Sequence, residues 1–390
     1  MVISAIITFA CKKQNNEAGN SRTFLKTYET DSVSYGTYVE QMGDGGYLII
    51  GTKGAGQPLI TRTDKEGKQL WTKPVASYCL NIISTVSQHW WVTKQQANLY
   101  TLQSGTSTTN IDSTGNIISS YHIPNNSYNF WANGPCIKAG TDYIIPMCNG
   151  NINYATYNYL FVLDQNLVYK RTDEINDALF GGKTLQFFTY NTTSSGSYYI
   201  WGQKLSRTNW SWADNPKIFI AKVHGNDPVI QTMIDTGLQV YNDAPEFQVQ
   251  GPDSSIILLA QRTDYKVVAA YPLVLKFDKN LNLIWKKEFP DAAGSLNLNE
   301  LSKCSDGGFL ITGQIQNFGF TDLYPYALKI DANGVKQWNK TVITKGTGKF
   351  TYGIKTDDGG YALIGYCNAF GVVPLGYRIL FIKTDTNGNL

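Results

Sequence analysis

The sequence predicts an all-β protein, a seven-bladed β-propeller of four-stranded antiparallel blades. The phrase Asp-Gly-Gly-aromatic, followed by an apolar run, occurs three times, at residues 44–47, 306–309 and 358–361. Each copy is followed by one further glycine: Gly51, Gly313 and Gly365. A second phrase, aliphatic-x-Lys/Arg-x-Asp-x-x-Gly, comes next in each copy. A recurring unit of this kind determines the architecture before any single residue does.

The second phrase gives the number of units. Its aspartate recurs six times, at Asp64, Asp112, Asp164, Asp278, Asp331 and Asp385. A degenerate copy surrounds His224, in the sequence Lys-Val-His-Gly at 222–225. Neighbouring copies lie between 48 and 60 residues apart, so the chain holds seven units of similar length.

Each unit is expected to form four short strands. In the first unit they are predicted over 35–42, 47–52, 59–63 and 70–75. Asp44-Gly45 between two apolar runs is a strong hairpin signal. Gly67 can take the positive φ that closes the second tight turn. The strand at 47–52 is apolar at nearly every position and needs cover on both faces. Four-stranded sheets packed face to face provide that cover.

The two ends of the chain predict how the last blade is completed. The seventh unit stops at Leu390, where its fourth strand is expected to begin. Phe24–Tyr28 (FLKTY) matches Trp338–Val342 (WNKTV), a fourth strand of another unit. We therefore expect the amino-terminal strand to pair near 379–383 and close the propeller, because paired edges avoid open strands. An open solenoid of the same units is the alternative.

The first 21 residues resemble a lipoprotein signal and tether. An apolar stretch, Val2–Ala10, precedes Cys11, and a polar segment follows over 14–21. We expect lipidation of Cys11 and a cell-envelope location, in the periplasm or on the outer-membrane surface. An ordinary apolar strand is the alternative, since nine apolar residues cannot span a bilayer. Residues 22–390 are expected to form a single propeller.

Composition excludes some classes of partner. The net charge is +3, charged residues make up 16% of the chain, and no basic stripe points to nucleic acid. We expect a monomer. Besides Cys11, five cysteines remain, with no metal-binding spacing: Cys79, Cys136, Cys148, Cys304 and Cys367. Cys148 and Cys367 follow the second strand of their units and are expected to be buried.

The unit Asp-Gly-Gly-Tyr…Gly…Lys-x-Asp-x-x-Gly-x-x-x-Trp resembles the repeats of secreted and lipid-anchored β-propellers of Bacteroidota. It is more distantly similar to the repeats of quinoprotein-like (PQQ-like) propellers. The resemblance covers about residues 22–390. It implies a location outside the cytoplasm and a binding or scaffolding role, and it implies no catalytic residues.

No catalytic residue, metal site or cofactor is predicted. The three histidines, His89, His122 and His224, have no partner at metal spacing. The Asp-x-x-Gly loops offer too few oxygens for calcium, so each aspartate is expected to cap its own turn. An enzyme, either a glycan-active hydrolase or lyase or a quinone-dependent dehydrogenase, would instead need acids at a central channel. Asp214, Asp264 and Asp322 are candidates for such acids.

The loops between second and third strands differ in every unit and carry aromatic residues. Variable loops on a rigid frame often carry function. Aromatic rings beside Asn and Ser suit a glycan or an envelope protein as ligand. The candidate ligand-binding residues are Trp210, Trp212, Tyr154, Tyr157, Tyr265, Phe318, Phe320, Tyr324, Phe370 and Trp131. Packing of loops on one another is the alternative. Trp71, Trp285 and Trp338 belong to the repeat and are expected in the core between blades.

Overall fold

The computed structural model is all-β. It describes residues 22–28, 33–54, 56–75, 91–104, 107–122, 130–132, 136–150, 156–175, 185–192, 198–204, 217–223, 230–239, 247–250, 254–264, 269–290, 295–316, 322–344, 346–368 and 376–390. Within these ranges every regular element is a β-strand, and no helix there has the length and apolarity to cross a membrane. The chain divides into two compact units. The first comprises Met1–Pro74, Asp264–Pro272 and Glu288–Leu390, and the second Val75–Thr263 and Leu273–Lys287.

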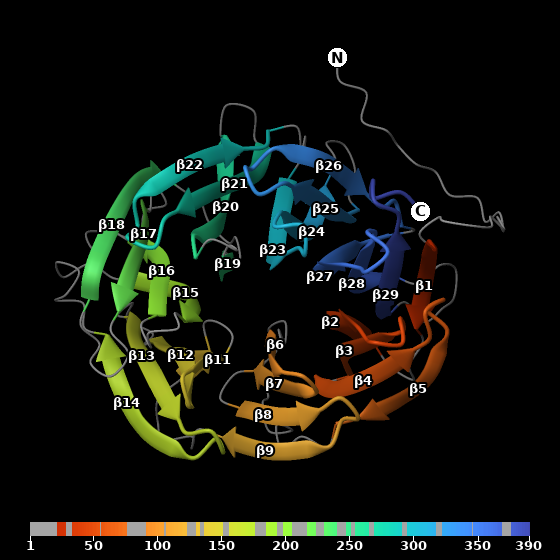
Figure 1. Ribbon diagram of the computed structural model, residues 1–390, viewed down its shortest axis with the longest axis horizontal. Coiled ribbons are helices and arrows are strands. Elements are labelled where there is room, and N and C mark those ends of the chain that lie inside the picture. The colour runs from red at the N-terminus through yellow and green to blue at the C-terminus, as the bar shows by residue number, and fades with distance from the viewer. Residues whose placement is uncertain are drawn as a thin grey trace. The chain divides into compact units, whose positions relative to one another are not determined.

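The first unit contains three four-stranded antiparallel sheets (Figure 1). One consists of β2 (Ser34–Gln41), β3 (Tyr47–Lys53), β4 (Gln57–Thr63) and β5 (Gln69–Pro74). Another consists of β23 (Ser295–Lys303), β24 (Phe309–Gln316), β25 (Tyr324–Ile330) and β26 (Lys336–Thr341). The third consists of β27 (Gly348–Lys355), β28 (Tyr361–Asn368), β29 (Tyr377–Thr384) and β1 (Phe24–Tyr28).

The second unit repeats this pattern. One sheet consists of β6 (Trp91–Gln96), β7 (Leu99–Ser104), β8 (Ser107–Asp112) and β9 (Ile117–His122). Another consists of β15 (Leu185–Thr192), β16 (Tyr198–Lys204), β17 (Lys217–Val223) and β18 (Ile230–Gln239). A further four-stranded sheet, divided between the two units, consists of β19 (Phe247–Gln250), β20 (Ile256–Asp264), β21 (Ala269–Phe277) and β22 (Leu283–Glu288).

The remaining sheet corrects the predicted fold. It has five strands: β10 (Phe130–Ala132), β11 (Ile137–Ala139), β12 (Asp142–Gly150), β13 (Thr156–Leu163) and β14 (Tyr169–Ile175). Both β10 and β11 pair with β12, so two short strands occupy the place of one first strand. The prediction of seven four-stranded blades is therefore wrong: among the described residues, the β-propeller has six blades of four strands.

The amino-terminal strand completes the last sheet. β1 pairs antiparallel with β29, from Phe24 opposite Lys383 to Tyr28 opposite Ile379. This pairing is confirmed where the sequence predicted it. The Tyr28 hydroxyl also donates a hydrogen bond of 2.7 Å to the carbonyl oxygen of Gly67, in the turn before β5. β1 therefore joins two neighbouring sheets of the first unit.

The structure explains why the Asp-Gly-Gly phrase recurs. The first glycine of each copy has a positive φ of about 80°, as at Gly45 (φ 81), a conformation that suits glycine. The aspartate accepts a hydrogen bond from the N–H of the second glycine, as Asp306 does from Gly308 at 2.9 Å. The same aspartate faces the Lys or Arg of the second phrase, so the two halves of the repeat meet in space.

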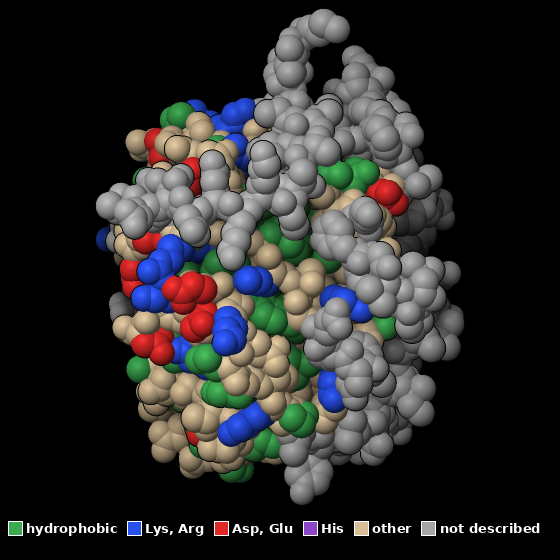
Figure 2. Space-filling model, turned by 90° about the vertical axis from the view of Figure 1, so that its right-hand side faces the viewer, with side chains coloured by type: hydrophobic (Ala, Val, Ile, Leu, Met, Phe, Trp, Pro, Cys, Tyr) green, Lys and Arg blue, Asp and Glu red, His purple; other side chains and the backbone are tan. Residues whose placement is uncertain are grey.

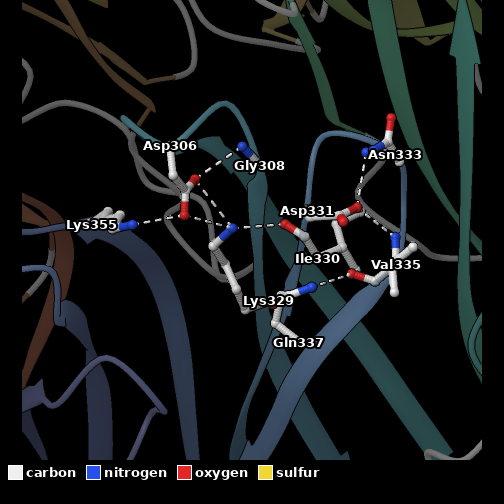
Figure 3. Close-up of polar contacts among 9 residues, drawn as sticks. All are labelled: Asp306, Gly308, Lys329, Ile330, Asp331, Asn333, Val335, Gln337 and Lys355. Carbon is white, nitrogen blue, oxygen red and sulfur yellow. Dashed lines mark hydrogen bonds and ion pairs between the residues drawn. The ribbon is translucent and has the colours of Figure 1, made fainter.

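The Lys or Arg of the third strand is buried in this contact, shown for Lys329 in Figure 3. The Lys329 side chain is 2% exposed and its amine donates to the Ile330 carbonyl oxygen at 2.7 Å. Its ammonium lies 3.3 Å from the Asp306 carboxylate, which also accepts from Lys355 at 2.8 Å. Burial raises the pKa of Asp306, but the hydrogen bonds from Lys355 and Gly308 outweigh this and the pKa is lowered. A buried ammonium without such a partner would cost several kcal/mol, roughly 3–5.

The same contact, here called the Asp–cation clamp, recurs in the other two sheets of the first unit. Lys383, also 2% exposed, lies 2.9 Å from Asp358, and Arg62 lies 2.5 Å from Asp44. Arg62 also donates to the Tyr47 carbonyl oxygen at 3.1 Å, which ties β4 to β3. The clamps thus hold the turn between the first and second strands against the third strand.

Apolar side chains fill the spaces between neighbouring sheets of the first unit. One cluster joins β24–β26 to β27–β29 and includes Leu310, Trp338 and Leu363. The Trp338 ring is 9% exposed and contacts the Tyr361 ring edge-on at 4.9 Å between centroids. Trp338 therefore lies in the core as predicted. Trp71 and Trp285 are half-buried, so their side chains are less enclosed than that of Trp338.

We predict that Gly46→Ala destabilises the protein, while Gly43→Ala in the same turn does not. A Cβ atom at Gly46 would lie 2.5 Å from Arg62 Nη1 and closer still to the Thr63 carbonyl oxygen. At Gly43 a Cβ atom would meet nothing within 4 Å. Chemical denaturation is expected to show a loss of about 2–3 kcal/mol in the free energy of unfolding for Gly46→Ala. Equal stability of the two variants would contradict the clamp.

Candidate functional site

The candidate site lies on the first strands of the three sheets of the first unit. β27 is packed between β23 on one side and β2 on the other (Figure 1). Each of the three strands has a β-bulge at the same place, where the pairing with the second strand shifts: at Thr37, Asn299 and Thr351. A bulge redirects the side chains next to it, and bulges are frequent beside functional sites.

Two of the bulged residues tie neighbouring sheets together. Asn299 Nδ2 donates to the Thr351 carbonyl oxygen at 2.7 Å. Thr351 Oγ1 donates in turn to the Gly36 carbonyl oxygen at 2.7 Å. These bonds run from β23 to β27 and from β27 to β2. They fix the three first strands relative to one another inside the first unit.

The single glycine that follows each Asp-Gly-Gly phrase, within the second strand, permits the bulge. A Cβ atom at Gly51, Gly313 or Gly365 would clash with a carbonyl oxygen of the first strand. The three oxygens belong to Tyr35, Asn297 and Lys349 respectively. Each of these residues precedes its glycine by 16 positions. The repeat therefore places three different side chains at equivalent positions. The constant spacing to the glycine marks these positions in the sequence, although the motifs alone did not indicate them.

The three equivalent residues Asn297, Lys349 and Tyr35 form a row across the first strands of the three sheets. Within this row, Lys349 contacts Asn297. Lys349 Nζ donates to Asn297 Oδ1 at 2.8 Å, from β27 to β23. The amine has no carboxylate partner among the residues that the structure describes. Burial lowers the pKa of Lys349 to about 8, because the charged form is poorly solvated there.

Tyr35, the third member of the row, belongs to a cluster of three tyrosines. Its ring lies 5.0 Å from Tyr366 and 5.5 Å from Tyr377, and Tyr366 lies 5.0 Å from Tyr377. All three side chains are half-buried. Burial raises the pKa of Tyr366 to about 12, and it raises the pKa of Tyr35 as well. We call Tyr35, Tyr366 and Tyr377 the tyrosine cluster.

The tyrosine cluster lies beside one connection between a second and a third strand. Tyr366 is close to the end of β28, and Tyr377 is the first residue of β29. The two residues therefore flank the connection between a second and a third strand. Tyr35 comes from the start of β2, the first strand of the neighbouring sheet. One unit of the repeat does not show which sheet lies next to it. The sequence therefore did not indicate that Tyr35 contacts Tyr366 and Tyr377.

A second row follows the bulges and contains Glu300, Tyr352 and Tyr38. The Tyr38 and Tyr352 rings lie 4.8 Å apart. Burial raises the pKa of Tyr352, and the negative charge of Glu300 raises it further. Burial also raises the pKa of Glu300 well above the ordinary range of a glutamate. The carboxyl thus replaces the tyrosine that the neighbouring sheets place at this position.

The turn aspartates bind their own backbone. Asp331 Oδ1 accepts the N–H groups of Asn333 at 2.9 Å and Val335 at 2.8 Å (Figure 3). The same two bonds recur from the backbone of the residues two and four positions after each of the other aspartates: Asp64, Asp112, Asp164, Asp278 and Asp385. The predicted turn capping is confirmed. In the described parts of the chain, no group of three or more His, Cys, Asp or Glu residues is placed to hold a metal ion.

The ligand-binding residues predicted from the sequence are mostly outside the described ranges. Residues outside them are Tyr154, Trp210, Trp212, Tyr265, Phe318, Phe320 and Phe370, together with Cys11. Trp131 lies in β10, and Tyr157 lies in β13 opposite Asn149. Tyr324, the first residue of β25, is 8% exposed. The described residues bring none of these candidates into the tyrosine cluster.

Three cysteines are buried and free. Cys136, Cys304 and Cys367 are each at most 2% exposed. The buried position predicted for Cys367 is confirmed. Burial raises the pKa of Cys367 to about 11, so the thiol stays protonated and unreactive.

Charged side chains are mixed on the surface. Figure 2 shows Lys and Arg interspersed with Asp and Glu on the side that it draws. This agrees with the small net charge of +3.

Comparison with known proteins gives remote structural likenesses only. No model of a protein family matches the chain, and no curated protein matches it. A protein of unknown function from Bacteroides caccae is 9% identical over 80% of this chain and 94% of its own, with a TM-score of 0.44. The Pan2 WD40 domain of Neurospora crassa is 12% identical over 93% of this chain and 96% of its own, with a TM-score of 0.48.

Drosophila Semaphorin 1a, extracellular domains 1–2, is 8% identical over 92% of this chain and 87% of its own, with a TM-score of 0.47. At these identities and scores the likenesses say nothing about the site. The likeness of the repeat to Bacteroidota propellers stays a resemblance.

We predict that Glu300→Gln removes part of the pH dependence of stability. The raised pKa means that the folded state holds this proton more tightly than the unfolded state. The stability contributed by Glu300 is then fully present below about pH 4 and is lost as pH rises toward its raised pKa, by at most about 1.4 kcal/mol per pH unit. Denaturation curves between pH 4 and 8 are expected to be flatter for Glu300→Gln. Glu66→Gln, at an exposed position, is the control; parallel curves for wild type and Glu300→Gln would refute the assignment.

Proposed function

We propose that this protein is a non-catalytic binding or scaffolding β-propeller whose contact surface includes the tyrosine cluster. One observation carries the proposal: three half-buried phenol rings from two neighbouring sheets contact one another beside the connection from β28 to β29. A cluster of this kind presents apolar ring faces and polar hydroxyl groups together.

The chemistry of tyrosine suits such a surface. A phenol gives a large contact area with few rotatable bonds, so little conformational entropy is lost when a ligand binds. Its ring stacks on the apolar face of a sugar or on an apolar side chain, while its hydroxyl forms hydrogen bonds. A glycan or an envelope protein is therefore the proposed ligand.

The frame below the cluster supports binding without rearrangement. Tyr35 belongs to β2, and Tyr366 belongs to β28, which pairs with β27. The hydrogen bond from Thr351 in β27 to Gly36 in β2 fixes these strands relative to one another. The Asp–cation clamps hold the opposite ends of these strands. Since binding energy is lost when a flexible site must be ordered, a fixed cluster retains more of it.

We propose in addition that the protein is anchored in the cell envelope. A lipid attached to Cys11 would tether the propeller in the cell envelope, in the periplasm or on the outer-membrane surface. The support is the apolar segment before Cys11 and the polar segment after it. Mass spectrometry of the membrane fraction tests this part independently of ligand binding.

We expect Tyr35→Ala combined with Tyr377→Ala to weaken glycan or envelope-protein binding by about tenfold or more, because two contact rings are lost. Binding to a glycan array and to solubilised envelope proteins measures this. The matched control is Tyr121→Ala combined with Tyr169→Ala. That pair also stacks, with centroids 6.4 Å apart, but lies on the fourth strands β9 and β14. Equal binding by both double variants would argue against the cluster.

Trp210 and Trp212, which lie outside the described residues, are separate candidates from the sequence for binding the same ligand. Asn209-Trp210-Ser211-Trp212 places the two rings on the same side if the segment is extended. Replacing both by alanine is expected to weaken binding severalfold and to leave the melting temperature nearly unchanged, since exposed rings contribute little to the core. A large drop in melting temperature with unaltered binding would show that these rings serve packing.

A further inference from the structure

Within the described part of the chain, the amine of Lys349 has no carboxylate partner. Lys349 is half-buried, and its hydrogen-bond acceptor is the neutral Oδ1 of Asn297 at 2.8 Å. Among the described residues no carboxylate pairs with it, whereas the buried lysines 329 and 383 each face an aspartate. A poorly solvated charge gains most from a partner of opposite sign.

Lys349 is a direct strand neighbour of one member of the tyrosine cluster. Lys349 lies directly opposite Tyr366 in the pairing of β27 with β28. Opposite residues of an antiparallel pair share one face of the sheet, with Cβ atoms about 4.5–5.5 Å apart. Tyr35, at the position equivalent to Lys349, is itself a member of the cluster. Charge and rings are therefore within reach of one ligand.

The donors match a carboxylate. Lys349 uses one of its three N–H groups for Asn297, which leaves two for a ligand. Because Asn297 Oδ1 faces the amine, its Nδ2 group points away from Lys349 as a further donor. Aromatic rings beside this set favour a ligand with both an anionic group and a flat, partly apolar face. An acidic sugar has both.

We propose that the ligand of the tyrosine cluster is an acidic glycan whose carboxylate is bound by Lys349, an inference that rests on the proposed binding function. The carboxylate provides a counter-charge that none of the described residues places beside the amine. The sugar ring stacks on the tyrosines.

The proposal predicts how binding depends on pH. An anion next to the amine favours its charged form, so the affinity for an acidic glycan falls as pH rises through about 8, where free Lys349 loses its proton. The titratable or charged groups on the strands around β27 are Glu300 and Lys303 on β23, Tyr324, Tyr326 and Lys329 on β25, Tyr35, Tyr38 and Glu40 on β2, Tyr361, Tyr366 and Cys367 on β28, and Tyr377, Arg378 and Lys383 on β29. Burial raises the pKa of Glu300, Tyr35 and Tyr366.

The test uses the full chain and an immobilised panel of uronate- and sialate-containing oligosaccharides, each next to its carboxyl methyl ester. The ester keeps the ring and removes the charge. Wild type is expected to bind an acid at least tenfold more tightly than its ester at pH 7. Lys349→Gln is expected to lose this difference, and Lys349→Arg to keep it without the decline above pH 8, since arginine stays charged.

The outcomes separate the two proposals. Equal binding of acids and esters by wild type would overturn the carboxylate assignment, as would an undiminished acid preference in Lys349→Gln. If the double variant Tyr35→Ala, Tyr377→Ala nevertheless loses binding to both acids and esters, the proposed binding surface is still supported. Failure of wild type to bind any member of the panel would overturn the glycan ligand altogether, and capture of an acidic peptide instead would have the same meaning. The wild-type acid–ester comparison remains decisive even if a Lys349 variant fails to fold.

Discussion

The buried cation on the third strand of a sheet, held by the aspartate of the Asp-Gly-Gly turn, is the contact on which the three sheets of the first unit depend. It explains two phrases of the sequence at once. The lysine or arginine needs a counter-charge because its side chain is removed from water. The aspartate supplies it, and the second glycine leaves the space that the cation occupies. Both phrases recur together in three units because each buried cation needs an aspartate as its counter-charge.

The third glycine of each repeat has a different effect. At Gly51, Gly313 and Gly365 the first and second strands approach too closely for a side chain, and the first strand bulges. The bulge brings residues of three sheets into rows. Because the backbone is repeated but the side chains are not, one frame presents Asn297, Lys349 and Tyr35 at equivalent positions. Invariant glycines thus leave neighbouring positions open to variation, and the candidate site uses that variation.

The sequence was sufficient where a local rule decides the outcome. Asp44-Gly45 predicted a hairpin, the Asp-x-x-Gly loops predicted capped turns, and the match of Phe24–Tyr28 to a fourth strand predicted its pairing with β29. It failed where packing decides. Two short strands replace the first strand of the sheet at β10–β14. Trp71 and Trp285 are less enclosed than Trp338, although all three hold the same repeat position. The tyrosine cluster was half visible: Tyr366 and Tyr377 flank a variable loop, but Tyr35 joins them only through the contact between sheets.

The pairing of β1 with β29 sets the order in which the chain can mature during translation. The ribosome releases Phe24–Tyr28 early and Tyr377–Thr384 at the far end of the chain. Bringing segments some 350 residues apart together carries a loop-closure entropy of roughly 5 kcal/mol. The pairing edges of β1 and β29 therefore stay open until both strands have been synthesised. Open strand edges pair readily with other chains, so these two edges are exposed to wrong pairing during that interval.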